Sequence, residues 1–254
     1  MKKKVFIFYL LLIHVFIFLV LLKSNFIERV RDKFGIINSE QEIAEICHET
    51  NCGPELARNY LDAIAYQSMM DSHIPDNAII FIGDSLTQSL PVATITPLGI
   101  NFGITNDTSL GVFKRLNQYS SIRRSKIVIF EIGLNDLSTR DPDEVIKNYE
   151  DIINYIPKNI EIIFNAVHPV NEDFYKNHGE SNERIDQLNR GLKHVCSKYP
   201  NVHFLSIATL LKDKNGNLSN EYHIGDGVHL NYYGYEIWIK ELKIKIEELS
   251  KKMN

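Results

Sequence analysis

Apolar and polar residues follow one another in a pattern typical of a protein that alternates strands and helices. Short continuous apolar runs, such as AIIFI at residues 78–82 and IVIFEI at residues 127–132, are typical of strands buried on both faces. Between these runs, apolar residues recur every three or four positions, as in helices that bury one side. The pattern predicts strands at residues 78–82, 99–102, 127–132, 160–167 and 202–207, and helices at residues 39–49, 109–119, 142–156, 181–198 and 231–250, with a further helix starting at Gly53 and Pro54.

Five strands separated by helices indicate an α/β fold, a three-layer αβα sandwich with a mostly parallel sheet in the middle. In sheets of this kind, ligands bind beyond the carboxyl ends of the strands, near the point where the strand order reverses. We therefore expect any catalytic residues to follow directly after the strands.

The N-terminal segment predicts a membrane anchor. Lys2, Lys3 and Lys4 precede residues 5–22, which carry no formal charge. As a helix this stretch would be about 27 Å long, close to the thickness of a bilayer core. A cleaved signal peptide is the alternative, although no small-x-small cleavage site and no lipobox cysteine follow the apolar stretch. The short basic start resembles an export signal, so we expect the rest of the chain outside the cytoplasm.

We accordingly divide the chain into three parts. Residues 1–23 are the anchor or signal peptide, residues 24–76 a linker with N-terminal helices, and residues 77–254 the α/β domain. The chain has 28 basic and 32 acidic residues and a net charge of −4, which excludes a generic basic nucleic-acid binder.

The cysteines add little to this interpretation. Cys47 and Cys52 are close enough in sequence to close a small disulfide loop in an oxidising compartment, and plain thiols are the alternative. A zinc site here would lack the second pair of ligands that makes such spacing convincing, so no metal is predicted.

Four short motifs follow the predicted strands. Ser85 comes after the first strand, Gly103 ends the second, Asn135 follows the third, and Asp226 and His229 come after the fifth. A serine at a strand-to-helix turn can present its hydroxyl as a nucleophile, and a histidine held by an aspartate can take its proton. A glycine N–H and an asparagine amide can both stabilise an oxyanion. These residue types together favour acyl transfer.

Each motif alone also has a structural explanation. Gly-Asp-Ser is an ordinary turn sequence, Gly103 can simply end a strand, and Asn135 can cap the next segment. Asp226 and His229 can form a structural hydrogen bond. The repeated placement of the motifs after strands, where this fold holds its chemistry, favours the functional interpretation.

The four motifs in this order resemble the sequence blocks of the SGNH, or GDSL-type, hydrolases. The matching blocks are GDSL at residues 83–86, Gly103, GLND at residues 133–136 and DGVH at residues 226–229, and the resemblance covers about residues 77–250. It implies a flavodoxin-like sheet with strand order 2-1-3-4-5. The family comprises esterases and lipases that need no metal and no cofactor.

The resemblance also implies a role for each matching residue. Ser85 would be the nucleophile, His229 the general base and then acid, and Asp226 the residue that orients His229. The oxyanion hole would consist of the N–H of Ser85, the N–H of Gly103 and the side-chain amide of Asn135. Two further histidines near the expected cleft, His168 and His223, are more simply interpreted as supporting residues than as substrate contacts.

We therefore expect a membrane-anchored serine esterase that hydrolyses acetyl or short acyl esters of cell-envelope glycans or lipids. An O-acyltransferase that uses a sugar hydroxyl as acceptor and a lysophospholipase are the alternatives with the same catalytic residues. A non-catalytic glycan- or lipid-binding module is the alternative of a different class. No nucleic-acid partner is expected.

Overall fold

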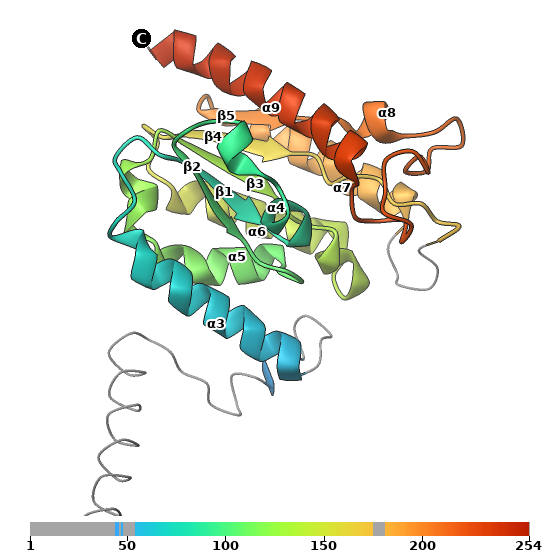
Figure 1. Cartoon of the computed structure of the whole chain (residues 1–254), viewed down its shortest axis with the longest axis horizontal. Coiled ribbons are helices and arrows are strands. Elements are labelled where there is room, and N and C mark those ends of the chain that lie inside the picture. Colours follow the sequence, from blue (N-terminus) through green and yellow to red (C-terminus); the bar gives the residue numbers. More distant parts are fainter. Residues whose placement is uncertain (1–43, 46, 48–53, 175–180, 254) are drawn as a thin grey trace, which may run out of the picture.

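The computed structural model describes residues 44, 45, 47, 54–174 and 181–253. Within this part of the chain, parallel strands form a five-stranded sheet in the order β2-β1-β3-β4-β5 (Figure 1). The predicted α/β fold class and the predicted strand order are therefore confirmed. The strands are β1 (Ile79–Gly83), β2 (Gly99–Gly103), β3 (Ile127–Glu131), β4 (Glu161–Asn165) and β5 (Val202–Leu205).

Helices cover both faces of the sheet (Figure 1). Two short elements were not predicted, namely α4, which directly follows β1, and α8, which follows β5. The predicted helix at residues 109–119 ends earlier as an α-helix and continues in 3-10 geometry. The helices are α3 (Pro54–Asp71), α4 (Ser85–Gln88), α5 (Ser109–Arg115), α6 (Pro142–Tyr155), α7 (Asn182–Cys196), α8 (Ala208–Leu211) and α9 (Tyr232–Met253), with 3-10 turns η1 (Val92–Thr94), η2 (Leu116–Gln118), η3 (Ser120–Arg124) and η4 (Asn135–Ser138).

Local hydrogen bonds explain where the helices begin. The Thr108 hydroxyl accepts the N–H of Gly111 at the start of α5, and the Ser181 hydroxyl accepts the N–H of Arg184 at the start of α7. Such side chains satisfy backbone donors that have no partner inside the helix. Helix α6 begins with Pro142, whose missing N–H costs nothing at a first helical position.

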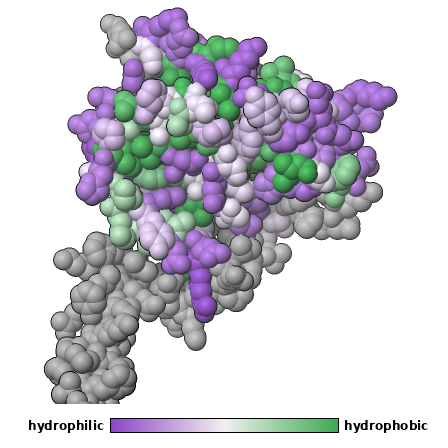
Figure 2. All heavy atoms as spheres, in the orientation of Figure 1, coloured by the Kyte–Doolittle hydropathy of each residue, from purple (hydrophilic) through white to green (hydrophobic). Residues whose placement is uncertain are grey.

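The core has two halves, one on each face of the sheet. Successive side chains of a strand point to opposite faces, so a continuous apolar run supplies both halves. Ile80 and Val128 lie side by side and pack with α5, α6 and α7, whereas Ile79 and Phe81 pack with α4, α8 and α9. Figure 2 shows that polar side chains cover much of the face in view, with apolar patches between them.

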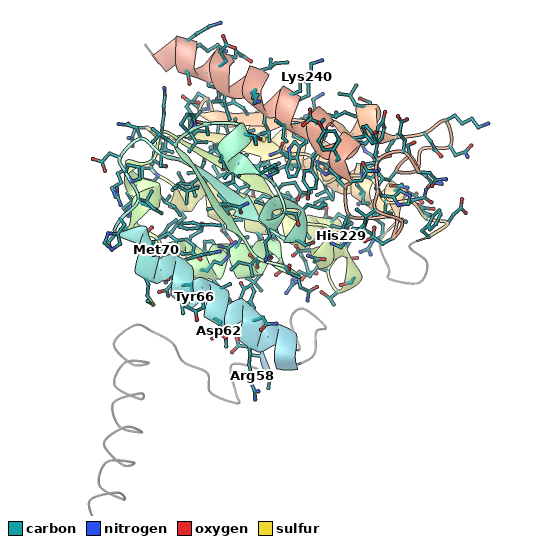
Figure 3. All side chains as sticks on the ribbon, in the orientation of Figure 1. Arg58, Asp62, Tyr66, Met70, His229 and Lys240 are labelled. Carbon is teal, nitrogen blue, oxygen red and sulfur yellow. The ribbon has the colours of Figure 1, made fainter. Side chains whose placement is uncertain are left out.

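Helix α3 belongs to the same folded body as the sheet. The Tyr60 hydroxyl donates to Asp107 Oδ1 at 3.0 Å, and the Tyr119 hydroxyl donates to Gln67 Oε1 at 2.6 Å. Figure 3 labels Arg58, Asp62, Tyr66 and Met70 along the exposed side of this helix. The predicted domain boundary at residue 77 stays a prediction, although these bonds tie the preceding helix to the α/β domain.

Several predictions concern residues outside the described part. The predicted anchor at residues 5–22 lies there, and so does Cys52 of the predicted disulfide. Of the predicted helix at residues 39–49, the described residues 44, 45 and 47 are helical. In the described ranges, none of the helices combines the length and the apolar character needed to cross a bilayer.

Candidate active site

Ser85 lies at the carboxyl end of β1, as the first residue of α4. The side chain of Asp84 accepts the N–H of Leu86 at 3.0 Å and so caps this short helix. The Ser85 hydroxyl oxygen lies 2.9 Å from His229 Nε2. The turn after β1 therefore presents the serine hydroxyl to a histidine that is 144 residues away in sequence.

Asp226 and His229 face each other across one turn of the loop before α9. His229 Nδ1 lies 2.6 Å from Asp226 Oδ2, while Asp226 Oδ1 accepts the N–H groups of Val228 and His229, each at 3.0 Å. Burial raises the pKa of Asp226, but the bonds from Val228 and His229 outweigh it and leave the pKa below its usual value. An ionised carboxylate can only accept, so Nδ1 carries the hydrogen and Nε2 can take the proton of Ser85.

His223 shapes the loop that carries this pair. Its Nδ1 accepts the N–H of Gly225 at 3.0 Å and of Gly227 at 3.2 Å, and both glycines have positive φ angles, +107° and +81°. The other ring nitrogen lies 3.1 Å from Asn220 Oδ1. Because both glycines flank Asp226, the His223 ring holds the backbone on each side of the carboxylate. This is a supporting role, as expected for His223, although the sequence did not indicate which groups the ring contacts.

Asn135 begins η4 just beyond β3 and lines the same pocket as Ser85. The side-chain amide of Asn135 has two N–H donors. One of them donates to the carbonyl oxygen of Asp107 at 2.9 Å, which leaves the other for a ligand in the pocket. Gly133 precedes it with φ at +130°, and a Cβ at this position would collide with the Tyr149 hydroxyl. The chain can therefore turn from β3 into the pocket only because residue 133 is glycine.

Gly103, the fifth residue expected at the site, is not brought into the pocket. Its N–H is donated to Asn101 Oδ1 at 2.8 Å, and a Cβ there would collide with the backbone of Gln88. Asn106 lies in the pocket instead, with φ at +66°. Asparagine adopts this left-handed conformation more readily than most residues. The sequence signal for a role of Asn106 is an asparagine shortly after a strand, and Asn106 was not among the expected site residues.

The pocket at Ser85 is small, with a volume of about 200 Å³. It brings together the four expected residues Ser85, Asn135, Asp226 and His229, which come from three separate parts of the chain. Its lining consists of Asp84, Ser85, Leu86, Thr105, Asn106, Leu134, Asn135, Asp226, Val228 and His229.

Buried carboxyl groups lie directly behind the pocket. Asp84 and Glu131 are both buried, and neither oxygen of Glu131 has a hydrogen-bond partner in the described part of the chain. Burial away from water disfavours the charged form of each carboxyl group, and the charge of Asp84 further disfavours that of Glu131. Burial raises the pKa of Asp84 to about 7 and raises that of Glu131 well above its usual value.

A second buried pair lies beside it. Arg115 Nε donates to Asp107 Oδ2 at 2.8 Å, and both side chains are almost fully buried. Arg115 also donates to the carbonyl oxygen of Phe102 at 2.8 Å. Burial raises the pKa of Asp107, and the guanidinium opposes this rise. The pair therefore links α5 to the end of β2, next to the residues that line the pocket.

His168, which follows β4, is buried against the ring of Trp238 at a centroid distance of 4.7 Å. Neither ring nitrogen has a hydrogen-bond partner in the described residues, and burial lowers its pKa to about 3. It does not line the catalytic pocket, which fits the supporting role expected for it. Among the described residues, no three His, Cys, Asp or Glu side chains are grouped as a metal site requires.

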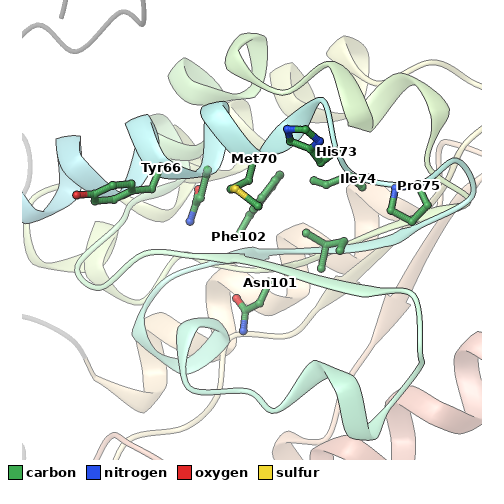
Figure 4. A pocket seen from close by; sticks show the side chains of 9 residues that line it. Tyr66, Met70, His73, Ile74, Pro75, Asn101 and Phe102 are labelled. Atoms are coloured by element: carbon green, nitrogen blue, oxygen red, sulfur yellow. The ribbon is translucent and has the colours of Figure 1, made fainter. Parts of the chain in front are cut away.

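A separate apolar cavity of about 380 Å³ lies between α3 and the edge strand β2. Figure 4 shows Tyr66 and Met70 on one side of it and Phe102 on the other. Its lining includes none of the residues expected at the catalytic site.

A family model described as the GDSL-like Lipase/Acylhydrolase family matches residues 81–237. A search of curated proteins finds no match.

Several solved structures are similar over most of the described chain. A protein from Streptococcus pneumonia named for platelet activating factor is 25% identical, with a TM-score of 0.69 over 75% of this chain and 94% of that chain. A GDSL-like lipase from Bacteroides thetaiotaomicron is 18% identical, with a TM-score of 0.62 over 73% of this chain and 97% of that chain. A variant of an acetyl-xylooligosaccharide esterase from Geobacillus Stearmophilus is 18% identical, with a TM-score of 0.54 over 68% of this chain and 95% of that chain. The last two likenesses show a shared fold.

Proposed function

The chain belongs to the GDSL-like lipase/acylhydrolase family, and from this premise we propose that it is a serine esterase that hydrolyses acetyl and other short acyl esters. The observation that carries the proposal is the continuous hydrogen-bond chain from Ser85 Oγ through His229 to Asp226, at 2.9 and 2.6 Å, on the wall of a pocket. This is the arrangement that a serine nucleophile needs for activation.

In the proposed reaction, Ser85 Oγ attacks the ester carbonyl while His229 Nε2 takes the hydroxyl proton. The tetrahedral intermediate collapses, the C–O bond to the alcohol breaks, and His229 returns the proton to the departing alcohol. Water then attacks the acyl-enzyme with His229 again acting as base, which releases the carboxylic acid and restores Ser85. Asp226 stays ionised throughout and stabilises the charged imidazole.

The oxyanion is stabilised by donors from three segments. We assign the N–H of Ser85 and the side-chain amide of Asn135, as expected from the sequence. For the third donor we assign the N–H of Asn106 in place of Gly103, because Asn106 lines the pocket and the N–H of Gly103 is donated to Asn101. Fixed donors of this kind act where negative charge develops in the transition state.

The size of the pocket supports a short acyl group. A space of about 200 Å³ holds an acetyl or similar group but offers little room for a long chain. An acetyl-xylooligosaccharide esterase among the structures of the same fold makes a glycan ester a reasonable class to test first. The predicted anchor at residues 5–22 supports a substrate at the cell envelope, with the catalytic domain outside the cytoplasm.

The direct test measures how fast the α/β domain hydrolyses 4-nitrophenyl esters with acyl chains of increasing length. We expect the highest kcat/KM at two to four carbons, on the order of a tenfold advantage or more over long chains, because each misplaced methylene costs binding energy. Ser85→Ala should lower kcat by roughly 10⁴ and abolish labelling by a fluorophosphonate. Ser197→Ala, on the exposed end of α7, is the matched control.

Four outcomes would redirect the proposal. Labelling of Ser85→Ala at another serine would contradict the assigned nucleophile. Faster product formation when sugar acceptors are added, with the acyl group recovered on the sugar, would identify an O-acyltransferase. A preference for lysophospholipids over acetylated glycans would identify a lysophospholipase, and a lack of any turnover would leave a binding module.

A further inference from the structure

A groove of about 850 Å³ runs along the first half of α9. Pro91 and Thr94 line one of its walls, and the helix supplies the other through Tyr232, Tyr235, Lys240 and Lys243. Nothing in the proposed triad uses this groove. Ser89, which directly follows α4, also lines it, and its volume exceeds the roughly 200 Å³ of the pocket at Ser85.

The groove begins beside the catalytic residues. Helix α9 starts at Tyr232, three residues after His229, and the Tyr235 hydroxyl donates to the carbonyl oxygen of Leu86 at 2.9 Å. Leu86 itself lines the catalytic pocket. Lys240 lies about 12 Å further along the helix axis than Tyr232, at 1.5 Å per residue. Figure 3 labels His229 and, further along α9, Lys240.

The volumes of the pocket and the groove indicate whether the groove receives the acyl part or the alcohol part of the ester. If the small pocket holds a short acyl group, the alcohol is the larger part of the ester. This part must leave the pocket on the side where space continues. The groove shares no lining residue with the pocket, but its residue Ser89 directly follows α4 and its residue Tyr235 donates to Leu86 of the pocket, so it offers that space next to the nucleophile.

The two lysines of the groove, Lys240 and Lys243, are both exposed. In the described part of the chain, neither forms an ion pair or a side-chain hydrogen bond. The lysines further along the same helix behave differently. Lys245 and Lys252 pair with Glu248 at 3.0 and 2.6 Å, and Lys251 pairs with Glu247 at 2.7 Å. Glu236 is the one acidic residue in the groove lining, so the lining carries a net positive charge.

The groove mixes ring faces with polar groups. Tyr232 is 69% exposed, and Ser89, Thr94 and Glu236 interrupt the apolar surface. Sugar rings match such a surface, because they present C–H faces as well as hydroxyl edges. A hydrocarbon chain would instead remove the polar groups from water without replacing their hydrogen bonds. The positive charge then favours a glycan that carries carboxylate or phosphate groups.

We propose that the α9 groove binds the alcohol part of the ester substrate and that this part is an acidic glycan. The inference rests on the proposed esterase function and specifies its substrate class. Lys240 and Lys243 act as specificity residues by binding an anionic group of the glycan, about two to three sugar units from the ester.

The test compares three substrates in wild type and in the double variant Lys240→Gln/Lys243→Gln. The substrates are 4-nitrophenyl acetate, acetylated xylo-oligosaccharides, which are neutral, and acetylated oligogalacturonates of equal length, which are acidic. Lys251→Gln/Lys252→Gln removes the same charge from the far end of α9 and is the matched control. Acetate release is measured at low and at high salt.

We expect wild type to prefer the acidic oligosaccharide, and the groove variant to lose about fivefold in kcat/KM on it at low salt, as for two partly exposed charge contacts. High salt should reduce this difference. The groove variant should match wild type on the two neutral substrates, and the control variant should match wild type on all three.

The remaining outcomes overturn the inference in distinguishable ways. If 4-nitrophenyl acetate is turned over but the groove variant matches wild type on the acidic oligosaccharide as well, the inference is refuted and the esterase function stays in place. Equal losses in the control variant reveal a general effect of net charge. Lysine-dependent turnover of lysophosphatidylglycerol in place of the acidic glycan assigns the groove to a lipid. A lack of turnover on every ester refutes the proposed function itself.

Discussion

Asp84 and Asp226 lie on either side of the proposed nucleophile in opposite environments. The side chain of Asp226 is 39% exposed, and hydrogen bonds from its own loop hold its pKa below the usual value. Asp84 is 2% exposed, and burial raises its pKa to about 7. The exposed carboxylate can stay ionised and orient a histidine, whereas burial favours the protonated form of the other. Solvent access thus separates the proposed catalytic role of Asp226 from the structural role of Asp84.

The same contrast holds for the segments that carry these residues. Asp226 lies on a loop whose shape depends on two glycines and the His223 ring. The buried group, which comprises Asp84, Glu131, Asp107 and Arg115, joins the ends of β1, β2 and β3. Substitutions in the loop should therefore change activity, and substitutions in the buried group should change stability.

The largest expected effect concerns Asp226→Asn. An amide cannot hold the His229 ring in the required tautomer, so kcat should fall by about 10⁴. The free energy of unfolding should change by about 0.5 kcal/mol or less, because the side chain is partly exposed. Turnover of 4-nitrophenyl acetate and urea unfolding give the two quantities. A parallel loss of activity and stability would remove the contrast between the two regions.

The next effect concerns Arg115→Met. This change leaves Asp107 buried without its counter-charge, so the free energy of unfolding should fall by about 3–5 kcal/mol. Equilibrium urea unfolding measures the loss. Arg190→Met, on the exposed face of α7, is the matched control and should change stability by about 0.5 kcal/mol or less. A similar loss in both variants would show that the buried pair has no special importance.

Asn135→Ala sharpens the comparison at the pocket itself. Loss of one oxyanion donor should lower kcat by about 10²–10³ with little change in KM, because the bond strengthens in the transition state. Asn106→Gly is the companion variant. It keeps the backbone N–H and the positive φ, so kcat should stay within about threefold of wild type. A loss confined to KM in Asn135→Ala would indicate that this residue binds substrate instead.

The smallest effect is a pH dependence of stability. The folded state raises the pKa values of Asp84 and Glu131, so it holds a proton that the unfolded chain releases near pH 4. This contribution to stability is complete below about pH 4 and is lost as pH rises through about 7. Asp107 and Asp136, which also raise the pKa of Asp84, favour the same direction.

Glu131→Gln tests this sign. The variant keeps the shape of the side chain and replaces the titrating carboxyl group with an amide. From pH 5 to pH 9, the free energy of unfolding should therefore fall less in the variant than in wild type, by a difference of about 1–2 kcal/mol. Urea unfolding across this pH range provides the measurement. Glu183→Gln removes an exposed carboxyl group from α7 and should leave the wild-type pH dependence unchanged. Identical curves for Glu131→Gln and wild type would contradict the raised pKa of Glu131.

Strands and short motifs, which depend on residues close together in the chain, could be predicted from the sequence. The apolar runs predicted all five strands, and the family resemblance supplied their order. Four of the five expected site residues, Ser85, Asn135, Asp226 and His229, lie at one pocket because each directly follows a strand or a turn with a recognisable motif. Periodicity and short motifs report such local preferences well.

Contacts between distant segments were decided by the tertiary structure alone. Gly103 is needed because the backbone of Gln88 packs against it, and the turn into the pocket comes three residues later at Asn106. In the sequence, Glu131 is one polar residue in an apolar strand, and only its burial near Asp84 in the folded chain raises its pKa. The position and protonation of a polar group depend on what surrounds it in space, and a one-dimensional pattern does not contain that information.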